Sequence, residues 1–110
     1  MAIHHASSGE LIDIRPLGDA LKTATTKALY KTQHLEVFRV VLLAGKAMPE
    51  HQVAGEFTVQ CLEGRVEFSA AGVSELMREG DLKCLVGGVP YALRAVDDCS
   101  VLVTLLIHGA

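Results

Sequence analysis

The side chains in this sequence that could do chemistry are five histidines and three cysteines, and their spacing matches no common catalytic motif. The cysteines form no CxxC pair, so neither a zinc ribbon nor a redox couple is indicated. The patterns GxSxG, HExxH and GxGxxG and the phosphate-binding loop are also missing, which leaves hydrolase, zinc-protease and nucleotide-binding functions without motif support. Any site must therefore be assembled by the fold from separate segments.

Four of the histidines have simple structural interpretations. Two lie in a short polar segment at the start of the chain, one precedes a predicted strand, and one is at the end of the chain, where termini are often loose. They are His4, His5, His34 and His108. We expect His34 to be a surface or half-buried residue and not a ligand, and we assign no function to the other three.

The three cysteines, Cys61, Cys84 and Cys99, have apolar neighbours in the sequence. An odd number of cysteines in such surroundings is typical of buried thiols in a reducing cytoplasm rather than of a disulfide framework. We therefore predict a cytoplasmic protein in which Cys84 and Cys99 fill the core.

Composition limits the class of protein. The chain has 110 residues, half of them hydrophobic, which is enough to bury the core of one domain. A formal charge of −3 and only five aromatic residues argue against a nucleic-acid partner. The longest apolar runs, residues 40–44 and 101–107, are too short to cross a bilayer, and no basic-then-apolar leader is readable. We expect a soluble protein with no membrane partner.

From Lys27 onward the sequence consists of short apolar, β-branched runs separated by Gly, Pro and Asp, without a sustained period of 3.6. The runs predict strands at residues 27–31, 35–43, 57–62, 65–69, 74–77, 81–85, 90–95 and 100–107. About eight short strands in one small domain leave many edges, which a jelly-roll barrel protects by closing the sheet. The predicted fold class is therefore all-β.

The turns and the first third of the chain complete this outline. Glu63-Gly64 and Ala71-Gly72 are expected to supply positive φ angles for hairpins. A short strand is expected at residues 10–15, followed by a segment without a clear pattern up to Lys27. We predict one domain over residues 1–110, made of an N-terminal arm (1–33) and a barrel core (34–107).

The middle of the chain resembles the first motif of the cupin family, which runs Gly, five residues, His, one, His, three or four, Glu, six, Gly. Gly45 is followed after five residues by His51, and Gly64 closes the motif at the right distance. Val53 stands in place of the second His, and Phe57 in place of the Glu.

The loop GDLKCLVGGVPY resembles the second cupin motif. Gly80, Gly88 and Pro90 fit it, whereas Tyr91 replaces the motif's His. With both motifs in order, the resemblance covers residues 35–107 and implies the cupin double-stranded β-helix, a jelly-roll barrel.

The same resemblance implies that the metal site is mostly lost. Cupins hold a divalent ion with three His and one Glu, and only His51 remains of these ligands. Val53 and Phe57 offer no donor, and Tyr91 could bind only as a phenolate, which is costly at a reference pKa of ~10. We expect no cofactor; a divalent metal (Fe, Mn, Ni, Co or Zn) is the alternative.

Residues two apart on a strand share a face, so the positions beside the former ligands should also face the interior. The predicted ligand-binding set is His51, Val53, Phe57, Val59, Cys61, Tyr91 and Leu93. An apolar wall in which His51 and Tyr91 converge as polar handles suits a small apolar or aromatic molecule, although the same residues could form a packed core. A catalytic role for Cys61 is not favoured, because apolar surroundings raise a thiol pKa.

Three functions follow from this interpretation. The first is a small-molecule-binding barrel that is non-catalytic or of unknown activity. The second is a metal-dependent dioxygenase or isomerase that uses His51 with Tyr91, Gln52 or Glu50, although Glu50 and Gln52 should point away from the His51 side. The third is a structural homodimer module, for which the apolar strand at 35–43 is suited. Whether the protein is an enzyme is left open by the sequence.

Overall fold

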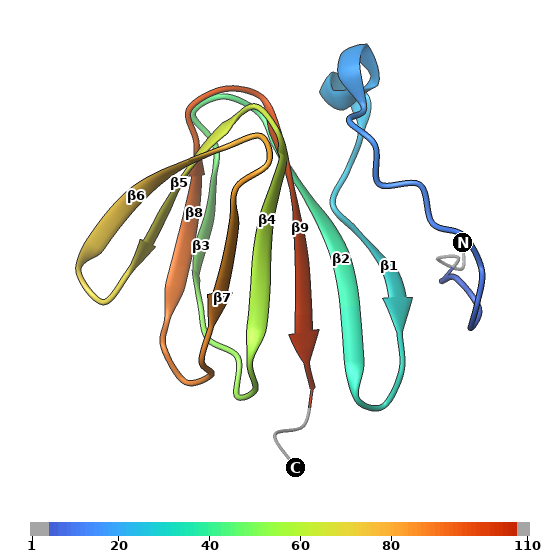
Figure 1. Ribbon diagram of the computed structural model, residues 1–110. Coiled ribbons are helices and arrows are strands. Elements are labelled where there is room, and N and C mark those ends of the chain that lie inside the picture. The colour runs from blue at the N-terminus through green and yellow to red at the C-terminus, as the bar shows by residue number, and fades with distance from the viewer. Residues whose placement is uncertain (1–4, 108–110) are drawn as a thin grey trace.

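A computed structural model describes residues 5–107, and most of these residues lie in strands (Figure 1). A 3-10 helix, Gly18–Thr23, precedes the first strand. The nine strands within the described range are β1 (Lys27–Lys31), β2 (Leu35–Leu42), β3 (Ala47–His51), β4 (Phe57–Glu63), β5 (Arg65–Ala70), β6 (Val73–Arg78), β7 (Leu82–Leu85), β8 (Tyr91–Ala95) and β9 (Cys99–Leu106). Among these residues no helix is long and apolar enough to cross a membrane.

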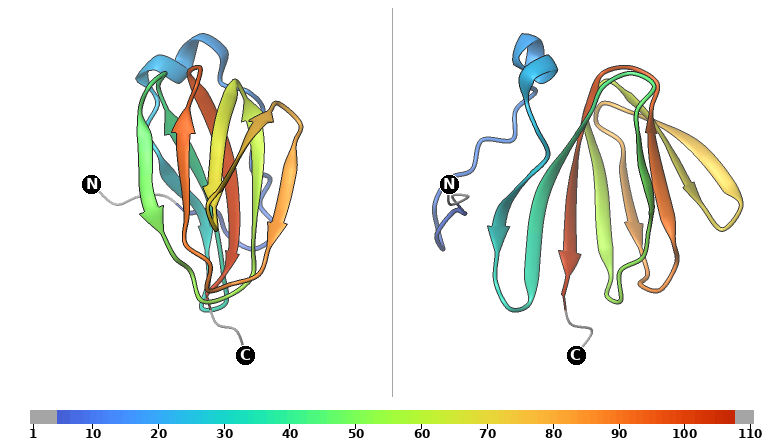
Figure 2. Two further views of the ribbon diagram at one scale, coloured as in Figure 1. Left: turned by 90° about the vertical axis from the view of Figure 1, so that its left-hand side faces the viewer. Right: turned by 180° about the vertical axis from the view of Figure 1, so that it is seen from behind.

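The strands form two antiparallel sheets that face each other, as the jelly-roll prediction required (Figure 2). One sheet has the order β1-β2-β9-β4-β7, and the other has the order β3-β8-β5-β6. Antiparallel strands with one buried face alternate between interior and exterior side chains. In β4, Phe57, Val59 and Cys61 are buried while Thr58 and Gln60 are only half-buried, so this strand turns its apolar side chains inward.

The eight strands predicted from Lys27 onward agree with the structure within one residue at each end, but the sequence analysis missed β3. This strand is short, largely exposed and interrupted by Pro49, so it lacks the apolar alternation on which the prediction relied. Because β3 is at a sheet edge and its pairing with β8 is irregular between Met48 and His51, the missing N–H of Pro49 is tolerated.

The strand predicted at residues 10–15 is wrong. This stretch belongs to a leading segment, residues 5–26, which lies beside β1 and makes a local turn instead of a ladder (Figure 1). Glu10 N donates to Ser7 O at 3.0 Å, and Arg15 N donates to an Asp13 oxygen at 2.9 Å, so backbone groups are satisfied locally. Local polar side chains compete with strand pairing in this way.

The two predicted hairpin turns differ. Ala71 and Gly72 have φ angles of 52° and 77° and join the paired strands β5 and β6, as a primed hairpin turn requires. Glu63-Gly64 instead leads from β4 in one sheet to β5 in the other, so the hairpin prediction is wrong there. Gly64 has a φ of 74°, and an added Cβ would lie 2.2 Å from the Asp98 carbonyl oxygen. The crossing therefore needs glycine both for its φ and for space.

Comparing two alanine substitutions separates these two needs. Gly72→Ala should reduce the free energy of unfolding by about 1–2 kcal/mol, the usual cost of a left-handed backbone, because nothing lies within 4 Å of its new Cβ. Gly64→Ala should cost at least ~2 kcal/mol more, because backbone atoms would have to move. Urea unfolding measures both, and equal losses would contradict the crowding at Gly64.

Candidate functional site

The ring of Tyr91 is buried in the barrel near one end, since Tyr91 begins β8 and pairs with Ala70 at the end of β5. Tyr91 is 1% exposed and stacks between Phe57, at a centroid distance of 4.8 Å, and Phe68, at 5.7 Å. These rings come from β8, β4 and β5, so the stack joins the two sheets. Aromatic stacking of this kind adds about 0.5–1.5 kcal/mol per pair to the burial of apolar area.

His51 lies beside this stack but is exposed, so the prediction that it faces the barrel interior is wrong. It pairs with Tyr91 in the β3–β8 register, and the two rings meet edge to face with centroids 6.2 Å apart. The two residues are therefore adjacent, as the motifs predicted, but no hydrogen bond joins them. Glu50 and Gln52, the unconventional ligands of the enzyme hypothesis, are also exposed, and the Gln52 amide donates to Gly88 O at 2.9 Å.

The hydroxyl of Tyr91 is buried and finds no hydrogen-bond partner among the described residues. Burial raises the pKa of Tyr91, so the hydroxyl stays neutral and keeps its proton at physiological pH. A buried hydroxyl without a partner is rare in folded proteins, because its desolvation costs about 1–3 kcal/mol. The group is a free donor inside the barrel.

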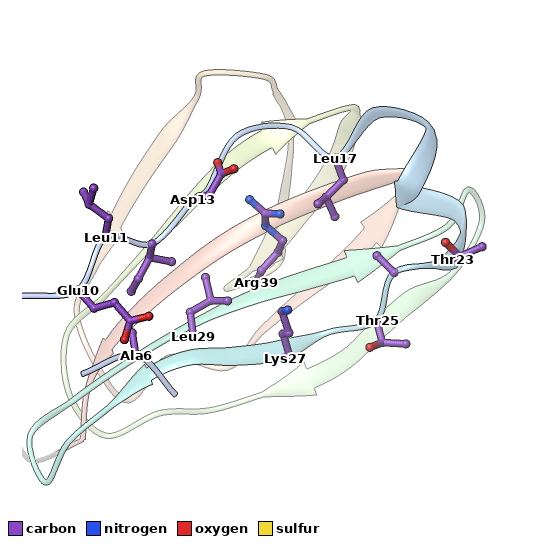
Figure 3. A pocket seen from close by; sticks show the side chains of 12 residues that line it. Ala6, Glu10, Leu11, Asp13, Leu17, Thr23, Thr25, Lys27, Leu29 and Arg39 are labelled. Carbon is purple, nitrogen blue, oxygen red and sulfur yellow. The ribbon is translucent and has the colours of Figure 1, made fainter. Parts of the chain in front are cut away.

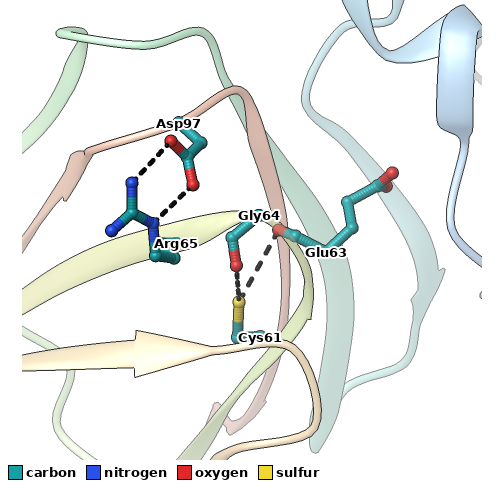
Figure 4. A network of polar contacts seen from close by, with 5 residues as sticks. All are labelled: Cys61, Glu63, Gly64, Arg65 and Asp97. Carbon is teal, nitrogen blue, oxygen red and sulfur yellow. Dashed lines mark hydrogen bonds and ion pairs between the residues drawn. The ribbon is translucent and has the colours of Figure 1, made fainter.

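The other predicted site residues lie along the barrel interior, and they do not all gather at Tyr91. Cys61 lies at the Gly64 crossing, whereas Tyr91 pairs with Ala70 at the other end of β5, so the structure does not bring these two together. Val59, Cys61 and Leu93 are buried, and Val53 is half-buried against the same core. The thiol of Cys61 donates to the carbonyl oxygens of Glu63 and Gly64 at 3.6 and 3.3 Å (Figure 4). Burial raises the pKa of Cys61 to about 11, so this cysteine is a packing residue and not a nucleophile.

The other cysteines and histidines correspond only in part to the predictions. Cys99 is fully buried, as expected, but Cys84 is exposed on the edge strand β7 and does not fill the core. The reason is the alternation of β7, whose exposed side includes this position. His34 is exposed, as predicted, and His4 and His108 lie outside the described residues.

The residues at the former ligand positions do not fit a cupin metal. Val53 and Phe57 have no donor atoms, and the Phe57 ring packs on Tyr91 where ligands would have to converge. Within residues 5–107, no three His, Cys, Asp or Glu side chains lie close enough together to hold an ion. A tight site normally needs three protein donors.

The sequence analysis missed two buried charges, Arg39 and Glu63, which are 6% and 7% exposed. Glu63 accepts hydrogen bonds from Leu17 N at 2.9 Å, Gly18 N at 3.1 Å and the Ser100 hydroxyl at 2.6 Å. Burial alone would raise the pKa of Glu63, but these donors outweigh it and the pKa lies below its usual value. The carboxylate thus attaches the leading segment to the barrel. The sequence did contain a signal for Arg39, because this charged residue interrupts the apolar run of β2.

Comparison with known proteins identifies the fold. No protein-family model and no curated protein matches the sequence. Among solved structures, the chain is similar to a conserved protein of unknown function from Streptococcus pyogenes (TM-score 0.75, 21% identity, 100% of this chain and 98% of that chain). It is also similar to a cupin superfamily protein from Desulfitobacterium hafniense (TM-score 0.76, 16% identity, 89% and 95%).

A third similar structure is an RmlC-like cupin from Methanocaldococcus jannaschii with a double-stranded β-helix fold (TM-score 0.74, 17% identity, 92% and 95%). Together with the two facing sheets, these likenesses show that the chain has the cupin fold, which confirms the prediction from the two motifs. At these identities the likeness describes the fold alone.

The missing donors lead to a prediction about metal content. Protein purified without a polyhistidine tag should contain well under one equivalent of Fe, Mn, Ni, Co or Zn by elemental analysis. The triple change Val53→His, Phe57→Glu and Tyr91→His should create binding for such an ion, because it restores four donors on the same frame. The matched control adds His51→Ala and should bind more weakly. A full, chelator-resistant equivalent in the unmodified protein would contradict the argument.

The Glu63 contacts lead to a pH-dependent prediction. Glu63→Gln should lower the free energy of unfolding by about 1–3 kcal/mol at pH 7, the usual contribution of charged hydrogen bonds. The folded pKa is below the unfolded value of about 4.3, so this contribution is present above pH ~4.3 and is lost as the pH falls through the folded pKa. The difference between the two proteins should therefore shrink in acid. The exposed Glu50→Gln, the control, should show little difference at either pH.

Proposed function

We propose that this protein is a metal-independent cupin barrel that binds one small, mostly apolar molecule beside His51 and Tyr91. The observation that carries the proposal is the Tyr91 hydroxyl, which is buried among aromatic rings and has no partner among the described residues. A ligand oxygen would supply the missing acceptor and remove the desolvation cost.

The surroundings of Tyr91 define the ligand class. Phe57 and Phe68 both stack on the Tyr91 ring, so we expect a ligand to meet the hydroxyl end of Tyr91 beside His51. Burial raises the pKa of Tyr91, so its hydroxyl is a neutral donor. A carboxylate would lose its hydration there without gaining a cation. A phenol or a neutral carbonyl compound is therefore favoured.

The neighbours of Tyr91 provide access and apolar contact. His51 is exposed and adjacent to the ring, so it marks the side from which a molecule would enter. The half-buried Val53 would contribute apolar surface at this side. Such a combination of an apolar wall with few polar groups is typical of small-molecule sites. The proposal assigns binding to these residues and assigns no reaction.

A thermal-shift screen of phenols, neutral carbonyl compounds and small aromatic or aliphatic acids tests the proposal. At least one phenol or carbonyl compound should raise the melting temperature, because it binds only the folded protein. Tyr91→Phe should weaken binding about fivefold, which corresponds to ~1 kcal/mol for one hydrogen bond. His51→Ala should also reduce the shift. Tyr30→Phe removes the other tyrosine hydroxyl, on β1, and should leave the shift in melting temperature unchanged.

The free protein provides a second readout. Because the hydroxyl has no partner, Tyr91→Phe should leave the melting temperature of the ligand-free protein unchanged or raise it. A clear loss of stability would mean that the hydroxyl already has a structural partner. No binding compound in a broad screen, or binding unaffected by both substitutions, would favour the structural-module interpretation.

A further inference from the structure

A second cavity lies outside the barrel, between the leading segment and the strands β1 and β2 (Figure 3). Its volume is about 490 Å³, which is within the range of small-ligand sites. Its lining combines apolar side chains with two cationic and two acidic residues; it includes Leu11, Ile12, Leu17, Leu29, Lys27, Arg39, Glu10 and Asp13. None of the residues predicted for the barrel site contributes to this lining.

Arg39 is the unusual member of this lining. Its side chain extends from β2 into the cavity, although the residue is only 6% exposed (Figure 3). One terminal nitrogen, Nη2, donates to Arg15 O at 3.0 Å, while the buried Nε has no partner. Among the described residues, no carboxylate forms an ion pair with this guanidinium. The positive charge of Arg39 acts on the nearby carboxylates of Asp13 and Glu63 and helps to lower their pKa values, but neither carboxylate accepts a hydrogen bond from its Nε. An acceptor oxygen at this point would therefore satisfy a buried donor.

The carboxylates around Arg39 are engaged elsewhere. Asp13 accepts from Arg15 N at 2.9 Å and pairs with Arg15 Nη1 at 3.3 Å, and the backbone bond is the main reason that its pKa is lowered. Glu10 accepts from Ser7 N at 2.9 Å. Glu63 accepts hydrogen bonds from Leu17 N of the leading segment and from the Ser100 hydroxyl. The cavity thus contains cationic donors whose nearest acidic neighbours already have other hydrogen bonds.

We propose that this cavity binds a small organic monocarboxylate. Its oxygens would accept from Nε and from the remaining N–H groups of Arg39, a fork geometry that matches a carboxylate. The Lys27 amine would add a second positive charge, and a short apolar tail would lie against Leu11, Ile12 and Leu29. Asp13 and Glu10, also in the lining, would disfavour a doubly charged anion such as phosphate.

Titration with hexanoate, monitored by calorimetry and by the ¹⁵N–¹H signal of Arg39 Nε, tests this proposal. Hexanoate should bind saturably and shift this signal, because the Nε–H gains an acceptor. Hexanamide, which has the same tail without the charge, should bind at least tenfold more weakly. Raising the salt concentration should weaken hexanoate binding, because salt screens the two cations. Equal binding of hexanamide, or an Arg39 signal that does not move, would overturn the proposal.

Variants locate the binding and separate it from the barrel site. Arg39→Leu should weaken hexanoate binding at least tenfold, and Lys27→Gln about threefold. Lys31→Gln, also on β1 but outside the cavity lining, should have no effect. If Arg39→Leu does not fold by circular dichroism, the exposed Lys27→Glu, which inverts a charge in the lining, should still weaken binding about tenfold. Unchanged binding in both Lys27 variants would refute the proposed role of that amine.

The proposed binding in the barrel and the proposed binding in the outer cavity can be refuted independently of each other. Tyr91→Phe should leave hexanoate binding unchanged, and Lys27→Gln should leave the binding of a barrel ligand unchanged, because the two linings share no residue among those proposed. Hexanoate binding that is lost in Tyr91→Phe and kept in Lys27→Glu would place the carboxylate in the barrel and overturn the inference.

Discussion

The crossing at Gly64 is the constraint on which much of the structure depends. A single residue separates β4 in one sheet from β5 in the other, and its backbone passes so close to Asp98 that no side chain fits. The neighbours of Gly64 reinforce the turn, since the Cys61 thiol bonds its carbonyl and Arg65 forms a two-point ion pair with Asp97 at 2.7 and 3.1 Å (Figure 4). The backbone geometry at Gly64 and the short polar contacts beside it therefore hold the two sheets face to face.

The same crossing positions the outer cavity. Glu63, the residue before Gly64, is directed away from the turn and accepts the N–H groups of Leu17 and Gly18. This attachment lies where the 3-10 helix begins, and the buried Leu21 of that helix adds an apolar contact. The leading segment, which forms one wall of the Arg39 cavity, is thus held by a carboxylate of the barrel. Weakening that attachment would alter the cavity without touching its cationic residues.

Inside the barrel, apolar side chains occupy the positions where the cupin motifs carry ligands. Phe57 and Tyr91 form part of an aromatic stack, and Val53 packs against the same core. Contacts of this kind stabilise the barrel by burying apolar area. Within this apolar cluster the Tyr91 hydroxyl is a buried polar group without a hydrogen-bond partner among the described residues.

The sequence by itself determined the fold class and the inward face of the barrel, because a strand's period of two and its turn residues are local properties. That reasoning located eight of the nine strands within the described residues and placed His51 beside Tyr91. It failed at β3, whose pairing depends on β8 and not on its own apolar pattern. Only the tertiary structure decided the partners of Glu63 and Arg39, because Leu17 and Arg15 are distant in sequence and reach them through the path of the leading segment.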